Sequence, residues 1–300
     1  MNRIPSKSVV QATAAVAALL ALGGCAKPEA QTTTDTAAKA SAAASTPAAA
    51  ATPNMVSFTA KEFSFEGPDT IPAGLTMIHL TDAGQELHHV QLIKLEEGKT
   101  FADFKAAAKE MAKGPPPSWI VFDGGVNPPA PGATTTAMQV LEPGNYAVIC
   151  LVEGPDHVPH MAKGMMRPLT VAPSANANTT EPTADVTLTL SDYAFTLSKP
   201  LVAGKQMIKV ENAAAQPHEV VLVQLAPGKT IEDVGKWVFE MKGPPPGKPI
   251  GGIPAFGKGK NSYFEADLTP GEYGMICFAP DAKDGKPHVQ HGMTKQFKVS

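Results

Sequence analysis

Residues 270–277 read PGEYGMIC, and residues 287–293, a short distance further along, read PHVQHGM. The first segment has the aromatic and apolar residues of a late β-strand and ends in a thiol. The second supplies an imidazole and a thioether. A loop that turns back on itself would bring Cys277, His288 and Met293 together.

The same arrangement occurs once earlier in the chain, where residues 143–150 read PGNYAVIC and residues 159–165 read PHMAKGM. Nine residues separate Cys150 from the next repeated histidine, against ten in the later copy. Both copies share the pattern Pro-His-x3-Gly-Met.

The two copies belong to a longer internal repeat. Residues 76–81 (TMIHLT) match residues 206–211 (QMIKVE), and the offset between matching residues stays between 127 and 130 along the chain. An offset this constant indicates two copies of one structural unit.

Composition shifts divide the chain further. We expect a signal peptide at 1–24, a lipidated cysteine with a disordered tether at 25–53, and domains at 54–172 and 184–300, joined by a linker at 173–183. The tether and the linker are rich in Ala, Thr, Ser and Pro and have almost no large apolar side chains. Such segments bury too little surface to offset the entropy of ordering.

The start of the chain has the pattern of a targeting segment. Arg3 and Lys7 precede an apolar run at 9–22, which is too short for a comfortable membrane span. The run ends in Leu-Gly-Gly-Cys25, which resembles the lipobox of bacterial lipoproteins. This resemblance implies acylation of Cys25 and anchoring to a membrane of the cell envelope, on its periplasmic or extracellular face. The alternative is an ordinary cleaved signal peptide with an incidental cysteine.

Composition excludes one class of partner. The formal net charge is −3, charged residues make up 18% of the 300 residues, and no basic stripe appears, so a nucleic acid is not expected as a partner. The 29 prolines and 26 glycines fit many turns between short strands.

The local patterns predict an all-β fold with one short helix inserted in each half. Residues 56–60 and 186–190 alternate with the period of two of a half-buried strand. Thr100 and Thr230, each with an aspartate three residues later, resemble helix N-caps. The expected fold is therefore two tandem Greek-key β-sandwiches.

Four kinds of metal-binding side chain match between the halves. By contrast, His79, His89, His157 and His291 have no histidine at the matching position. The matched pairs are His88 with His218, Cys150 with Cys277, His160 with His288, and Met165 with Met293. Two imidazoles, one thiolate and a weak thioether form the donor set of blue copper sites. Singly, each residue fits an ordinary core position, but four matched donors that occur twice favour copper in at least one domain, with one ion per domain if both sites are functional.

These motifs resemble those of the cupredoxins, most closely the plastocyanin-type proteins. The segment 212–221 (NAAAQPHEVV) is similar to their first-ligand segment, 271–277 to their thiolate strand, and 287–293 to the segment with their second histidine and axial methionine. The resemblance covers both halves and implies a Greek-key sandwich with copper near one end.

The sequence departs from this family in two ways. The loops between cysteine and second histidine are longer than usual, and His89 and Glu219 stand where the family often has asparagine. A longer loop can leave the sandwich and return, since the entropy cost of closing a loop grows slowly with its length. The alternative is a fold that persists without copper.

Three functions remain open. The leading hypothesis is a membrane-tethered electron carrier with an unidentified redox partner. The others are copper storage or delivery, helped by Met161, Met166, His157 and His291, and a copper-free interaction module. We do not expect an enzyme, because copper oxidases need further histidines for a catalytic copper.

Overall fold

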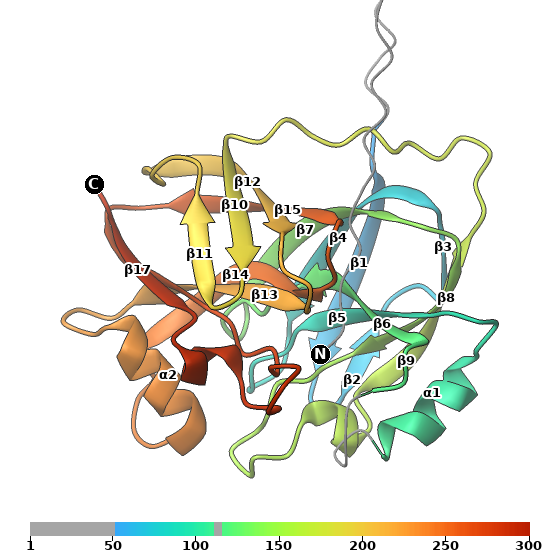
Figure 1. Ribbon diagram of the computed structural model, residues 1–300, viewed down its shortest axis with the longest axis horizontal. Helices are drawn as coiled ribbons and strands as arrows, with labels where there is room; N and C mark the ends of the chain where they lie inside the picture. Colours follow the sequence, from blue (N-terminus) through green and yellow to red (C-terminus); the bar gives the residue numbers. More distant parts are fainter. Residues whose placement is uncertain (1–51, 111–115) are drawn as a thin grey trace, which may run out of the picture. The chain divides into compact units, whose positions relative to one another are not determined.

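The computed structural model describes residues 52–110 and 116–300 (Figure 1). The predicted signal peptide, Cys25 and most of the predicted tether lie outside the described residues, as does Met111 at the end of the first predicted helix. Within the described ranges, no helix is both long and apolar enough to cross a membrane.

The first half of the chain consists mainly of short strands. Its elements are β1 (Asn54–Lys61), β2 (Ser64–Glu66), β3 (Thr70–Pro72), β4 (Gly74–Asp82), β5 (Val90–Leu95), α1 (Phe101–Ala108), β6 (Ile120–Val126), β7 (Thr134–Leu141), β8 (Gly144–Ile149), the 3-10 helix η2 (His160–Lys163) and β9 (Met166–Ala172).

The second half repeats this succession, without a strand equivalent to β3. Its elements are β10 (Val186–Ser191), β11 (Ala194–Leu197), β12 (Gly204–Asn212), β13 (His218–Leu225), α2 (Ile231–Glu240), β14 (Gly247–Phe256), β15 (Asn261–Leu268), β16 (Gly271–Ile276), the 3-10 helix η3 (His288–His291) and β17 (Thr294–Val299).

The strands form two sheets that run through both halves. One sheet has the order β11-β10-β12-β15-β7-β4-β1-β2, and the other has the order β17-β16-β13-β14-β6-β5-β8-β9-β3 (Figure 1). Within each half, equivalent strands occupy equivalent places in this order. The prediction of an all-β fold built from repeated sandwiches is confirmed.

The halves meet where their sheets join. Strand β15 pairs with β7 in one sheet, and β14 pairs with β6 in the other. A side-chain amide reinforces the second junction, since Gln91 Nε2 donates to the backbone oxygen of Ala255 at 2.9 Å. The buried carboxylate of Asp123 forms an ion pair with Lys260 across the same junction. The largest buried apolar cluster accordingly includes side chains of both halves.

The predicted helix caps are present in both inserted helices. Thr100 and Thr230 each accept a hydrogen bond from the backbone N–H of the aspartate three residues later, and each aspartate accepts from the threonine N–H in return. This reciprocal pairing satisfies two of the N–H groups that a helix start leaves free. Helix α1 buries Phe104 and helix α2 buries Ile231 and Val234 in apolar clusters on the β5 and β13 sheet.

The segment predicted as a linker is held at two points. The oxygen of Asn178 accepts from the backbone N–H of Leu75 at 2.5 Å. Glu181 accepts hydrogen bonds from Asn261 and from the hydroxyl of Tyr263 on β15. The segment between β9 and β10 contains no strand, and the division into two domains stays a prediction.

Limited proteolysis tests this division. We expect cleavage within residues 173–183, because this segment lies outside both sheets and proteases favour exposed irregular backbone. The two fragments should separate under denaturing conditions but elute together in gel filtration, since the β7–β15 and β6–β14 pairs hold them together. Fragments that elute separately would contradict the continuous sheets, and resistance to cleavage would contradict the linker.

Candidate metal centre

The backbone after Cys277 folds back onto the end of β16. The N–H of Val289 donates to the oxygen of Cys277 at 2.8 Å, and the N–H of Cys277 donates to the oxygen of Met293 at 3.3 Å. The N–H of His288 donates to the oxygen of Ala279 at 2.9 Å. These bonds place η3 directly beside the cysteine.

The long loop between Cys277 and His288 leaves this region and returns to it. Pro280 and Pro287 form an isolated β-bridge, and Asp281 N donates to the oxygen of Lys286 at 2.8 Å. These two contacts join the ends of the loop, so its extra residues form a small projection. The length of the loop does not hold His288 away from the thiol.

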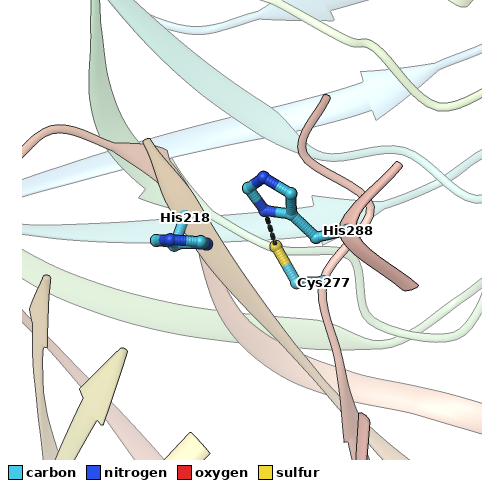
Figure 2. A group of neighbouring side chains, drawn as sticks. All are labelled: His218, Cys277 and His288. Carbon is cyan, nitrogen blue, oxygen red and sulfur yellow. Dashed lines mark hydrogen bonds between the residues drawn. The ribbon is translucent and has the colours of Figure 1, made fainter. Parts of the chain in front are cut away.

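His218, Cys277 and His288 converge, and all three are fully buried. One ligand atom from each lies within 4.8 Å of the other two. The Sγ of Cys277 is 3.4 Å from Nδ1 of His288, and the centroids of the two imidazole rings are 4.4 Å apart. Figure 2 shows the sulfur of Cys277 next to the ring of His288, with the ring of His218 beside them.

Carboxylates face the outer edges of both rings. Nε2 of His218 lies 3.0 Å from an oxygen of Asp192, and Nε2 of His288 lies 3.7 Å from an oxygen of Asp281. The remaining nitrogen of His218, Nδ1, is buried without a hydrogen-bond partner. A carboxylate behind an imidazole is the usual way to orient a metal-binding ring.

Met293 follows the turn that closes η3. Gly292 takes a φ of 88°, in the left-handed region that glycine adopts without a steric penalty. The N–H of Met293 then donates to the oxygen of His288 at 3.0 Å, and its side chain is fully buried in the same apolar cluster as Cys277. The predicted fourth residue thus lies on the same folded segment as the other late donors.

The first half repeats this backbone arrangement. Met161 N donates to the oxygen of Cys150 at 2.8 Å, and Met165 N donates to the oxygen of His160 at 2.9 Å. The Sγ of Cys150 is 3.6 Å from Nδ1 of His160, whose ring centroid is 4.9 Å from that of His88. His88, Cys150, His160 and Met165 are all fully buried.

The first histidine is bound differently in the two halves. Nδ1 of His88 lies 2.9 Å from an oxygen of Asp82, which is itself fully buried, and Nε2 is the nitrogen without a partner. In the second half, Asn212 occupies the position of Asp82, and Nδ1 of His218 is the free nitrogen. The first histidine of each half therefore leaves one buried ring nitrogen without a partner, but on opposite edges of the ring, and Nε2 of His288 is a further buried nitrogen without a hydrogen bond. Among the described residues, only the group of the second half brings three ligand atoms within 4.8 Å of one another.

Burial favours the neutral form of both thiols and of His288. It raises the pKa of the Cys150 thiol to about 12, and the pKa of the Cys277 thiol is raised for the same reason. Burial, with the nearby ring of His218, lowers the pKa of His288 to about 4. Neutral imidazoles can bind a metal directly, whereas each thiol must lose its proton when a metal binds. Both cysteines are free rather than joined in a disulfide.

The sequence did not reveal the roles of His89 and Glu219. Each donates its backbone N–H to the sulfur of the cysteine in its own half, at 3.5 Å. Each side chain then accepts from the N–H of the residue after that cysteine, with His89 bound to Leu151 at 3.0 Å and Glu219 bound to Phe278 at 2.7 Å. The imidazole of His89 and the carboxyl of Glu219 thus accept the same backbone hydrogen bond, each in its own half. The available signal was a polar residue at the same position in both copies.

An aromatic side chain packs on the second histidine of each half. The ring of Phe63 meets that of His160 edge-on at 5.3 Å, and the ring of Tyr193 meets that of His288 at 5.6 Å. Both aromatic residues have positive φ angles, in the turns that follow β1 and β10. The hydroxyl of Tyr193 donates to Asp281 at 2.5 Å and so fixes the loop beside His288.

Four histidines have no histidine at the matching position of the other half. All of them except His89 lie outside the two groups of predicted metal ligands. His79 is half-buried on β4 and is bound to Thr136, and His157 is exposed in the first Cys–His loop. His291 forms a cluster with Asp281 and Asp284, 3.2 Å from the latter. Met161 and Met166 pack in the apolar cluster that includes Phe104 of α1, whereas Cys150 belongs to the larger cluster.

Comparisons with known proteins give matches among solved structures. No protein-family profile matches the chain, and no curated protein sequence matches it. A reduced auracyanin from the photosynthetic bacterium Roseiflexus castenholzii is 20% identical, with 41% of this chain and 100% of that chain covered and a TM-score of 0.29. A blue copper oxidase from Nitrosomonas europaea is 14% identical, with 83% and 86% covered and a TM-score of 0.25. A copper-containing nitrite reductase from Thermus scotoductus is 11% identical, with 82% and 61% covered and a TM-score of 0.23.

The buried carboxyl of Glu219 makes stability depend on pH. Burial raises the pKa of Glu219 to about 7 in the folded chain, above its ordinary value of 4.5. The protonated carboxyl therefore favours the folded state. This contribution is fully present below pH 4.5 and is lost as the pH rises to about 7, by an amount on the order of 3 kcal/mol.

Glu219→Gln should remove this loss of folding stability at rising pH. We expect the free energy of unfolding of the metal-free variant, relative to the parent chain, to increase between pH 4.5 and pH 8, as measured by urea denaturation. Taking this difference cancels the titration of the histidines, which both proteins share. Glu232→Gln on the exposed face of α2 is the matched control and should show no such trend. A pH-independent difference for Glu219→Gln would show that the carboxyl does not titrate in this range.

Proposed function

We propose that this chain is a cupredoxin-like electron carrier that holds one copper ion in each half. The observation that carries the proposal is the buried convergence of His218, Cys277 and His288, together with an imidazole nitrogen of His218 that has no other partner. A buried polar atom without a hydrogen bond is costly, and a bound metal would satisfy it.

The donor types support copper. A thiolate and two imidazoles, with a buried methionine on the same folded segment, are soft donors that suit blue copper better than a hard ion such as Mg²⁺. When bound, copper supplies a one-electron change between Cu(I) and Cu(II). In the second half we assign His218, Cys277 and His288 as the strong ligands and Met293 as the weak axial one; in the first half we assign His88, Cys150, His160 and Met165.

The surrounding residues suit electron transfer. Each thiol accepts a backbone N–H, which stabilises negative charge on the sulfur once the proton has left. Asp192 accepts a hydrogen bond from Nε2 of His218 and so holds this ring from behind, and Asp281 faces the ring of His288 at 3.7 Å. The donors thus need little rearrangement between oxidation states. Complete burial of the ligands also favours a retained ion over one that is stored or passed on.

The position of the protein in the cell belongs to the same proposal. The lipobox-like ending at Cys25 supports a lipid anchor, and the tether that follows would let the copper-binding halves reach a partner protein at the membrane surface. We place the protein in the cell envelope, with its redox partner a protein of the same compartment. The remaining histidines do not form a second, catalytic copper group in the described residues, which favours a carrier over an oxidase.

Copper loading of the chain from residue 26 onward tests the metal sites. We expect two copper ions per chain and intense visible absorption from the Cu(II)–thiolate bonds. Cys277→Ser should lose one ion and its share of the absorption, Cys150→Ser should lose the other, and the double variant should be colourless. Metal content and the visible spectrum are the measurements.

Two further variants separate ligand roles. Met293→Leu should keep copper and colour but shift the reduction potential, because an axial thioether bond is long and weak. His291→Ala, which alters an exposed ring close to the same site, should leave both unchanged. A parent chain that stays metal-free after loading under reducing conditions, and colourless after reoxidation, would refute the carrier and favour a copper-free interaction module.

Membrane fractionation tests the anchor. Cys25→Ser should move the protein from the membrane to the soluble fraction, or leave it as an unprocessed precursor, because the acyl chains that hold it are lost. Cys150→Ser is the control for removal of a cysteine elsewhere. Unchanged membrane association of the Cys25 variant would show that another segment anchors the chain.

A further inference from the structure

The two proposed copper sites lie on one sheet. His218 begins β13 and His88 lies just before β5, and only β14 and β6 separate these two strands. The inference below rests on the proposed function, since it concerns two sites that each hold a copper ion. It addresses how these sites communicate.

The register of the sheet sets their separation. His218 pairs with Phe256, Phe256 pairs with Asp123, and the neighbouring Phe122 pairs with Ile93. Three interstrand spacings amount to about 14 Å, and the distance along β5 back to His88 adds about 16 Å in the perpendicular direction. The two sites are therefore on the order of 20 Å apart. At this separation, the rate of electron transfer depends on how continuously covalent and hydrogen bonds connect the two sites.

Each thiol is bonded to the strand that leads toward the other site. The N–H of His89 donates to Sγ of Cys150, and the N–H of Glu219 donates to Sγ of Cys277, both at 3.5 Å. The residues that follow them are Val90 and Val220. A connection between these two valines would complete a bonded route from one sulfur to the other.

Asn127 makes this connection. Its Nδ2 donates to the oxygen of Val220 at 2.8 Å, and its neighbour Val126 pairs with Val90 in the β5–β6 ladder. The backbone N–H of Asn127 also donates to the oxygen of Gly252 on β14 at 3.1 Å. The full route is Cys150, His89, Val90, Val126, Asn127, Val220, Glu219 and Cys277.

The environment of Asn127 indicates that an asparagine has a specific role at this position. The residue is fully buried, and its side-chain oxygen has no hydrogen-bond partner. A buried amide with one unsatisfied atom costs stability compared with an apolar side chain of similar size. The connection to Val220 is a reason to retain it.

We propose that the two copper sites exchange one electron within the chain, and that the Asn127 side chain carries the connection between the halves. In each transfer the reduced site of one half loses one electron and the oxidised site of the other half gains it. No bond breaks and no proton moves. The chain would thus hold two electrons and deliver them through whichever site meets a partner.

Flash reduction of the fully oxidised, copper-loaded chain tests the proposal. A photochemically generated one-electron reductant, supplied in less than one equivalent, reduces either site, and the electron then redistributes between them. With Met293→Leu as the background, the two sites differ in potential and the redistribution becomes visible in the absorption. We expect a phase whose rate does not depend on protein concentration and which is absent when Cys150→Ser or Cys277→Ser is added.

Asn127→Leu should slow this phase by tenfold or more while both coppers and their spectra remain. Asn261→Leu is the matched control: it removes an amide that also joins separate segments, but in the other sheet. If Asn127→Leu does not fold, Asn127→Asp, which keeps the size but loses the amide donor, should slow the phase in the same way.

The possible failures are distinct. A chain without colour refutes the proposed function itself. Coloured sites that equilibrate only through collisions between molecules refute exchange within the chain. A concentration-independent phase that Asn127→Leu and Asn127→Asp leave unchanged refutes the assignment of the connection to Asn127.

Discussion

The hydrogen bond from the Glu219 N–H to Sγ of Cys277, with its counterpart from His89 to Cys150, fixes the relation between the early and late donors. It holds the start of one strand against the end of its neighbour. The side chain of the same residue then accepts the next N–H along the cysteine segment. The first histidine stands immediately before this double connection, so backbone geometry places it beside the thiol, and a carboxylate, Asp82 or Asp192, then contacts its ring.

The order of the donors could be predicted because it is local. The Pro-His-x3-Gly-Met pattern encodes a single turn of 3-10 helix closed by a glycine with positive φ, which returns Met293 to the oxygen of His288. The helix caps could be predicted for the same reason, since Thr100 and Asp103 are only three residues apart. In both cases the sequence pattern and the hydrogen bonds cover the same few residues.

Contacts between distant segments could not be predicted in this way. Asp192 reaches His218 from a turn 26 residues earlier, and Asn127 reaches Val220 across 93 residues. Nothing in the local pattern around either residue specifies its partner. The pairing of β7 with β15 was likewise unforeseen, because an edge strand and a strand within a continuous sheet show the same alternation of apolar side chains. The two halves were therefore expected to be separate, although their sheets join.

The repeat shows which features the fold requires and which it leaves free. Backbone hydrogen bonds around the thiol are the same in both halves, whereas the side chains that contact the donors differ. Asp82 is replaced by Asn212, and the imidazole of His89 by the carboxyl of Glu219. Because the frame is built from backbone groups, it tolerates these exchanges, although the exchange of Asp82 for Asn212 accompanies a different orientation of the first histidine ring. A duplicated chain of this kind can hold two groups of the same residue types on the same backbone frame in different electrostatic surroundings.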